Sequence, residues 1–341
     1  MKEQTGQTRR VGFRPGHRQT AVLALLGATL LWGSSFTSIK VCGSALAGAV
    51  HRHVPSEFGP LLLTAVRFTL ALPLLLLGWR PARNLRMRAS DLPYLAGVAI
   101  PMATGFGLQA AGLATVAATL SGFVTGLCVC VTPALEWGVF GHRPNRWLVV
   151  GIAMATLSVC LMTGGSAEGW RFNLGVVLTA LCTLAFSFQI ICTGRASRRV
   201  GAGPITTASF AAAAALGWAA ALALGGPVAV GEALRAVAAN PLFWKHAVIL
   251  VLGATIGAMV LMNVFQERVS SSEAAVIYTA EPVFAMIFAV AILGLPEVPS
   301  AVGWIGVALI LAANLIVALA PASPAEHAAD RVPMEDDEKK P

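Results

Sequence analysis

The chain is a succession of apolar stretches, each about long enough to cross a lipid bilayer. A bilayer core requires roughly 20 consecutive apolar residues in a helix, because every backbone amide must bond within its own segment. Ten stretches meet this requirement, over residues 20–40, 60–79, 92–113, 118–140, 147–165, 174–194, 204–225, 246–264, 273–294 and 300–320. We therefore expect an all-α polytopic membrane protein with ten transmembrane helices.

The composition agrees with a membrane environment. Hydrophobic residues make up 56% of the chain and charged residues only 12%, and the mean hydropathy is +0.74. Soluble domains carry roughly 25% charged residues, so this chain lacks the charge for a water-exposed surface. A cytosolic enzyme, a secreted disulfide scaffold and a disordered protein are excluded. The net charge of +8 does not indicate nucleic acid, because most basic residues lie in short gaps between apolar stretches.

The basic residues also predict the orientation. Of the 24 Lys and Arg, 18 lie in the two tails and the even-numbered gaps, 5 lie in the odd-numbered gaps, and Arg67 lies within a span. Because Lys and Arg accumulate on the cytoplasmic side, we expect a multi-pass protein of the cytoplasmic membrane with both termini in the cytoplasm. A cleaved signal peptide at the first stretch is an alternative, but nine remaining spans would break this alternation.

The parts of the chain outside the spans are short. The tails, 1–19 and 321–341, are polar and carry prolines or charges, so we expect them to be disordered. The sequence contains no HExxH, no Gly-x-Ser-x-Gly and no phosphate-binding glycine motif. Five of the six cysteines lie within spans, without the spacing of a metal site. These features predict no enzyme activity, no cofactor and no metal.

The informative residues are those that are costly to bury in lipid. A charge at mid-bilayer costs at least about 2.5 kcal/mol, so it is expected to face a partner or a cavity. Arg67 lies about 10 Å below the outer edge of the second span by helix rise, and Lys40 closes the first span. Both are candidates to attract a substrate carboxylate. Snorkelling of Lys40 and structural bonding of Arg67 are the alternatives.

The ninth stretch carries a deep carboxyl group. Glu281 is followed by Pro282, which removes a helical hydrogen bond, and Tyr278 lies on the same helix face. We expect Glu281 to contact a substrate amine or to carry a coupling proton, with an ion pair to Arg67 or Lys40 as the alternative. Trp32 and Gln109 are further candidates for substrate binding. Glu136 is expected near the cytoplasmic edge of the fourth span.

Ten spans divide into two sets of five, and an odd number per set makes the sets run in opposite directions. Such inverted repeats place the binding site at their interface near the midplane. The sequence gives modest support. Pro133 in the fourth span corresponds to Pro282 in the ninth, and Gly151 opens the fifth span as Gly306 opens the tenth. We expect repeats at 20–165 and 174–320.

Several motifs resemble one family. They are Leu31-Trp32-Gly33-Ser34-Ser35-Phe36 with Ile39-Lys40, then Arg67-Phe68, then Glu281-Pro282-Val283-Phe284-Ala285, and Gly303-Trp304-Ile305-Gly306-Val307-Ala308-Leu309-Ile310. In order, spacing and ten-span layout they resemble EamA-type transporters of the drug/metabolite transporter superfamily. The family's Gly-Glu pair after the proline-bearing helix is interrupted here, because two residues separate Gly294 from Glu297. We therefore carry no role over to Glu297.

The resemblance implies two inverted five-helix repeats and alternating access without ATP. It implies a small-molecule substrate, in many members an amino acid that is exported. A passive channel and a non-transporting sensor or scaffold are the alternatives. The lipid bilayer is the expected partner, with no nucleic acid, and proton or ion coupling is a further expectation.

Overall fold

The computed structural model describes residues 15–51, 53–83, 88–140, 146–164, 173–265 and 277–319. All regular structure in these ranges is helical, which agrees with the predicted all-α class. Nine helical stretches of the described residues, some made of consecutive shorter helices, are long and apolar enough to cross a membrane, and a shorter apolar helix covers 281–293. The predicted tails fall almost wholly outside the described residues, as does the first part of the predicted span 273–294.

The helices follow the predicted spans closely in order. They are α1 Pro15–Gly48, α2 Phe58–Gly78, α3 Leu92–Leu113, α4 Ala118–Gly126, α5 Cys128–Phe140, α6 Arg146–Gly164, α7 Leu174–Val200, α8 Ala202–Ala238, α9 Pro241–Val248, α10 Ala258–Phe265, α12 Glu281–Leu293 and α13 Ala301–Ala318. Short helical turns lie at η1 Arg80–Arg83, η2 Ala89–Asp91 and η5 Leu295–Glu297, and η3 Ile249–Gly257 joins α9 to α10.

Local sequence explains several helix ends. The Asn240 side chain accepts a hydrogen bond from the Phe243 amide at 3.1 Å, and Pro241 opens α9 where no amide is needed. Ser300 likewise accepts from the Gly303 amide at 3.0 Å, at the start of α13. Gly294 ends α12 with a φ of 85°, which other residues rarely adopt. This turn carries the chain directly into η5.

Three spans are interrupted. The predicted span 118–140 is divided at Leu127 into α4 and α5, and α8 is kinked at Gly226, which has a φ of 68°. The predicted seventh span, 204–225, ends at this kink. The segment η3 is a π-helix, in which the wider turn is supported by a hydrogen bond from the Thr255 hydroxyl to the Leu250 carbonyl at 2.7 Å. Irregular helices of this kind occur in membrane proteins where the backbone lies within protein or lines a cavity.

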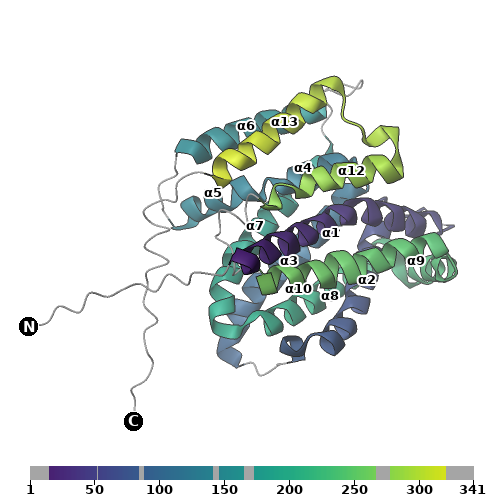
Figure 1. Ribbon diagram of the computed structural model, residues 1–341. Coiled ribbons are helices and arrows are strands. Elements are labelled where there is room, and N and C mark those ends of the chain that lie inside the picture. Colours follow the sequence, from purple (N-terminus) through teal and green to yellow (C-terminus); the bar gives the residue numbers. More distant parts are fainter. Residues whose placement is uncertain are drawn as a thin grey trace, which may run out of the picture.

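The helices pack as layers around α1 (Figure 1). One side of α1 contacts α12 and the other contacts η3 and α10, while α2 packs on α8 and α3 packs on both α7 and α8. At one edge of the molecule α6 and α13 lie side by side. Many neighbours in space therefore come from opposite halves of the sequence.

The packing leaves large apolar side chains on the outside. Leu23, Leu77 and Ile100 are each more than 60% exposed, whereas Phe36 and Phe58 are fully buried in the core between the helices. An exposed surface of this kind is unfavourable in water and favourable in lipid. The surface therefore matches a bilayer, as the composition predicts.

Candidate functional site

The carboxyl group of Glu281 lies at the start of α12, three residues after Tyr278. In the part of the chain that the structure describes it makes no hydrogen bond and no ion pair, and it is only partly exposed. The Tyr278 ring lies one turn earlier and meets the Trp32 ring of α1 edge to face, with 5.8 Å between centroids and 61° between planes. This contact brings together three residues that the sequence analysis selected separately.

Other small polar groups stand near the same carboxyl group. Pro282, next to Glu281, packs on Gly126 of α4, two residues before Cys128 at the break between α4 and α5, and Cys182 of α7 lies 3.9 Å from the Thr125 hydroxyl. The Cys128 thiol donates to the Thr183 carbonyl at 3.6 Å. The Ser187 hydroxyl of α7 is buried and has no hydrogen-bond partner among the described residues. The Glu281 region is thus a polar cluster within the membrane-spanning body.

Small residues allow α12 to approach its neighbours closely at this end. A side chain at Gly33 of α1 would overlap Phe284 and Ala285, with its Cβ only 2.6 Å from the Phe284 Cβ. Gly122 of α4 is equally close to Ala285, with 2.7 Å between the two Cβ positions. Helices in lipid associate through such contacts, since no hydrophobic effect drives them together. The position of Glu281 is therefore fixed by tight backbone packing.

Beyond the other end of α12 lies a second carboxyl group with a very different environment. Glu297 in η5 is 4% exposed and forms a salt bridge with Lys40 at 3.0 Å. Its second carboxylate oxygen accepts a hydrogen bond from the Thr119 amide at 3.0 Å, at the start of α4. The Thr119 hydroxyl donates to the Glu297 carbonyl at 2.9 Å, and Lys40 also donates to the Val116 carbonyl at 2.9 Å. We call these four residues the Lys40–Glu297 clasp.

The clasp changes the interpretation of two residues. Lys40 does not simply snorkel to the interface, because its ammonium group is held by Glu297 and a carbonyl. It also does not pair with Glu281, which was one sequence alternative. Glu297, to which the sequence analysis gave no role, supplies a negative charge to the exposed amides at the start of α4. Sequence reasoning missed it because 257 positions separate it from Lys40.

Arg67 occupies a third and separate environment. It is 4% exposed, and its Nε donates to the Thr255 hydroxyl of η3 at 2.6 Å. The guanidinium lies over the Phe68 and Phe106 rings at 5.3 and 5.0 Å from their centroids. These contacts come from α2, α3 and η3, whereas α12, which carries Glu281, packs on α1 and α4. Neither the carboxylate nor the carbonyl partner anticipated for Arg67 is present among the described residues.

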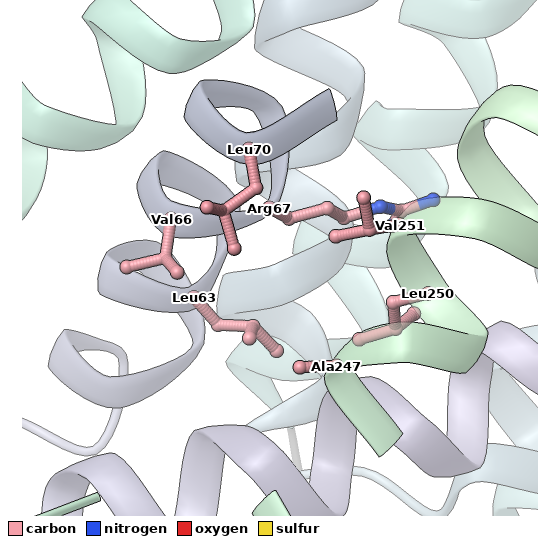
Figure 2. Close-up of a pocket in the computed structure, with 7 residues that line it drawn as sticks. All are labelled: Leu63, Val66, Arg67, Leu70, Ala247, Leu250 and Val251. Carbon is pink, nitrogen blue, oxygen red and sulfur yellow. The ribbon is translucent and has the colours of Figure 1, made fainter. Parts of the chain in front are cut away.

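A small apolar groove lies beside Arg67 (Figure 2). It is shallow, with no enclosed space for a water molecule, and is lined by Leu63, Val66, Arg67, Leu70, Ala247, Leu250 and Val251. The Arg67 side chain runs from α2 past Val251, with its nitrogen atoms beyond that residue. The other residues of the groove are aliphatic. The Arg67 guanidinium therefore makes its contacts with Thr255, Phe68 and Phe106 in the interior and not with the groove.

The last two acidic or amide candidates lie on other helices. Gln109 is 4% exposed on α3, on the face where Gly105 and Gly112 pack against α7, and makes no hydrogen bond within the described part of the chain. Glu136 is partly exposed on α5. The structure thus brings together Trp32, Tyr278 and Glu281, and it places Lys40, Arg67 and Gln109 in other surroundings. The roles of all six in binding stay predictions.

The long apolar helices and these buried charges define a class, that of multi-pass helical membrane proteins. The sequence model of the EamA-like transporter family matches residues 19–164 and again residues 173–319. The chain therefore belongs to the EamA-like transporter family, and the resemblance inferred from its motifs is confirmed.

Two further comparisons agree with this assignment. An uncharacterized transporter of Archaeoglobus fulgidus is 29% identical over 306 residues, which cover 89% of this chain and 87% of that protein. A solved crystal structure with 19% identity superposes with a TM-score of 0.53, covering 88% of this chain and 96% of that chain. The first likeness supports membrane transport in general, and the second concerns the fold alone.

Proposed function

We propose that this protein is a secondary transporter that moves a small amine-bearing metabolite across the cytoplasmic membrane by alternating access, without ATP. Export is the direction that the family resemblance favours, with amino acids among the candidate substrates. The observation that carries the proposal is the unpaired Glu281 carboxyl group beside Trp32 and Tyr278. A buried charge without a partner is costly in lipid and is usually retained for function.

The contact between α6 and α13 supports two halves of opposite direction. Gly151 packs against Ala313 and Val317, while Gly306 packs against Ser158 and Met162. Adding the offset between the two glycines, 155 positions, to Ser158 and Met162 gives Ala313 and Val317. The start of each helix thus meets the end of the other through equivalent residues. An antiparallel pair related by twofold exchange has this pattern, as inverted repeats require.

The surroundings of α1 and α7 follow the same exchange. Helix α1 contacts the ninth span, α12, and the eighth, which consists of α9, η3 and α10. Helix α7 contacts the fourth span, α4 and α5, and the third, α3. When the two sets of five spans are exchanged, the first span becomes the sixth, the ninth becomes the fourth and the eighth becomes the third. The neighbours of α1 then become the neighbours of α7. This supports repeats at 20–165 and 174–320 that rock about a shared centre, with the tails 1–19 and 321–341 outside them.

Each candidate residue has a place in this proposal. Glu281 receives the substrate amine, or a proton when the site is empty, and exchange of the two would couple export to proton entry. Trp32 and Tyr278 contact the body of the substrate. Lys40 and Arg67 meet a substrate charge only after their bonds to Glu297 and Thr255 open, and Gln109 offers an amide at the α3–α7 interface. No step of the proposal assigns a catalytic residue or a cofactor.

Proteoliposome transport distinguishes this function from the alternatives. We expect a saturable rate of transport. We also expect counterflow, in which an excess of unlabelled solute inside the vesicles drives uptake of labelled solute from outside. A passive channel gives flux without saturation and no counterflow. A sensor or scaffold gives no flux, and Glu281→Gln then leaves the phenotype and ligand binding unchanged.

A tolerance screen tests the direction. A deletion strain and an overexpressing strain are compared on toxic amines and toxic amino acids. We expect the overexpressing strain to tolerate at least one compound better and the deletion strain to tolerate it less well. Equal tolerance of every compound in both strains would contradict export.

A further inference from the structure

The surroundings of Glu281 also restrict the chemical class of the substrate. We infer that the site of Glu281, Trp32 and Tyr278 selects organic monocations, that is amines and ammonium ions without a carboxylate, over zwitterions such as amino acids. This inference rests on the proposed function and narrows its substrate. It begins from the observation that no Lys, Arg or His in the described part of the chain forms an ion pair with Glu281.

An amino acid brings two charges, and each needs a partner inside the membrane. Among the described residues, the intramembrane cations that the sequence offers for a carboxylate are Lys40 and Arg67. Lys40 is bound to Glu297, about 18 Å from Glu281 by the length of α12. Arg67 is bound to Thr255 and stacked on Phe68 and Phe106, in a different group of helices. Both cations are thus occupied, and neither lies in the Glu281 cluster.

The groups around Glu281 suit a cation. The Trp32 and Tyr278 rings present π-electron density, to which a cation is attracted, and Trp32 is the best residue for such contacts. The Cys128, Cys182 and Ser187 side chains are neutral acceptors or weak donors. No described residue donates a hydrogen bond to the Glu281 carboxyl group or forms an ion pair with it, so its charge has no compensating partner among them. An organic cation would supply the missing compensation.

A zwitterion is disfavoured at the same place. Its carboxylate would enter a region that already holds one carboxyl group and in which no described residue offers a free cation, and like charges in a low-dielectric site repel strongly. The site then discriminates against the zwitterion because the carboxylate of the zwitterion finds no partner. An unpaired charge on a competing ligand is an effective source of specificity. We expect at least tenfold weaker binding for a ligand that differs from the cation only by an added carboxylate.

Equilibrium binding to the purified full-length protein tests this inference. The probes share one body: trimethyl(2-phenylethyl)ammonium is the cation, N,N,N-trimethylphenylalanine adds a carboxylate, and 3-phenylpropionate has the carboxylate alone. The quaternary ammonium cannot cross the membrane as a neutral amine. We expect the tritiated cation to bind saturably, the zwitterion to compete at least tenfold less well, and the anion not to compete. Equal or tighter binding of the zwitterion would overturn the inference.

Variants assign the effect to Glu281. Glu281→Gln is expected to weaken binding of the cation at least tenfold, whereas Glu281→Asp, which keeps the charge, retains part of it. Glu57→Gln is the matched control, because Glu57 is a partly exposed carboxyl group just before α2, away from the Glu281 site. Gel filtration and unfolding temperature verify that each variant folds. Unchanged binding in a folded Glu281→Gln protein would also overturn the inference.

Counterflow separates a wrong substrate class from a wrong function. If no cation binds but the wild-type protein shows saturable counterflow of a neutral or anionic solute, the inference fails and the transporter proposal stands. If no solute found in the tolerance screen shows saturable flux, the proposed function fails, and the inference fails with it.

Discussion

Helix α12 is associated with two carboxyl groups whose environments are opposite. Beyond its C-terminal end, Glu297 is bound by Lys40 and by the Thr119 amide, and its backbone carbonyl receives the Thr119 hydroxyl. At its N-terminal end, Glu281 has no bonded partner among the described residues. The difference teaches that depth in the membrane does not by itself identify a functional charge. What distinguishes the two is whether the fold compensates the charge.

The largest effect is expected from breaking the clasp. Glu297→Gln leaves the Lys40 ammonium without a carboxylate and weakens the hydrogen bond to the Thr119 amide. Loss of one partner from a buried ion pair costs about 3–5 kcal/mol, and we expect the lower end because Lys40 is 29% exposed. Chemical unfolding in detergent measures the change.

Two controls accompany this prediction. The double variant Lys40→Met with Glu297→Gln removes both charges and should recover part of the lost stability. Asp91→Asn breaks the exposed pair that Asp91 forms with Arg199 at 3.2 Å, and should change stability far less. Equal losses for Asp91→Asn and Glu297→Gln would contradict a special role of the clasp.

Next in size is the packing that fixes the Glu281 end. Gly33→Ala places a Cβ against Phe284, so α1 and α12 must separate, which costs about 1–3 kcal/mol. Gly27→Ala is the matched control on the same helix, since its Cβ would meet only Leu261 at 3.8 Å. This control should be neutral or stabilising, because alanine favours helix. Similar unfolding temperatures for both variants would refute the close contact.

The charge of Arg67 is compensated more than that of Glu281 and less than that of Glu297. It has one hydroxyl partner, Thr255, and lies over two aromatic rings. Thr255→Val removes the hydroxyl and leaves the Arg67 Nε–H unbonded, at a cost of about 1–3 kcal/mol. Thr255→Ser keeps the hydroxyl and should retain most of the stability. If the two variants unfold alike, the hydrogen bond contributes nothing measurable.

The smallest effect on stability is expected at Glu281 itself. Glu281→Gln replaces an uncompensated carboxyl group with a neutral amide of the same shape, so the free energy of unfolding should change by no more than about 0.5 kcal/mol or should rise. Comparison with Glu297→Gln under the same conditions gives the contrast directly. A loss of several kcal/mol would mean that Glu281 has a structural partner.

Much of the fold was predictable because lipid imposes strong constraints. Apolar length placed the spans, and the predicted boundary at residue 225 coincides with the kink at Gly226. The interruption at Leu127 and the π-helix of η3 carried no local signal. The π-helix depends on Thr255, whose hydroxyl is bonded to Arg67 at a separation of 188 positions. Interactions of this range arise only when the helices are assembled.

The candidate site was predicted as separate residues and not as a cluster. The cost of burial selected Glu281, and helical spacing linked it to Tyr278. Trp32 was a separate candidate on another helix, and its contact with Tyr278 follows from the packing of α1 on α12. Glu297 was set aside because its motif was interrupted. Its role depends on Lys40 and Thr119, which periodicity within one helix cannot reveal.

The 13 residues of α12 have a mechanical consequence. After Pro282 the helix contains neither glycine nor proline, so it offers no flexible joint between its ends. A tilt that draws Glu281 toward a bound solute must therefore displace η5 at the far end, where the clasp joins it to α1 and α4. Ligand affinity and closure of that end are then thermodynamically linked, and each must influence the other by the same factor.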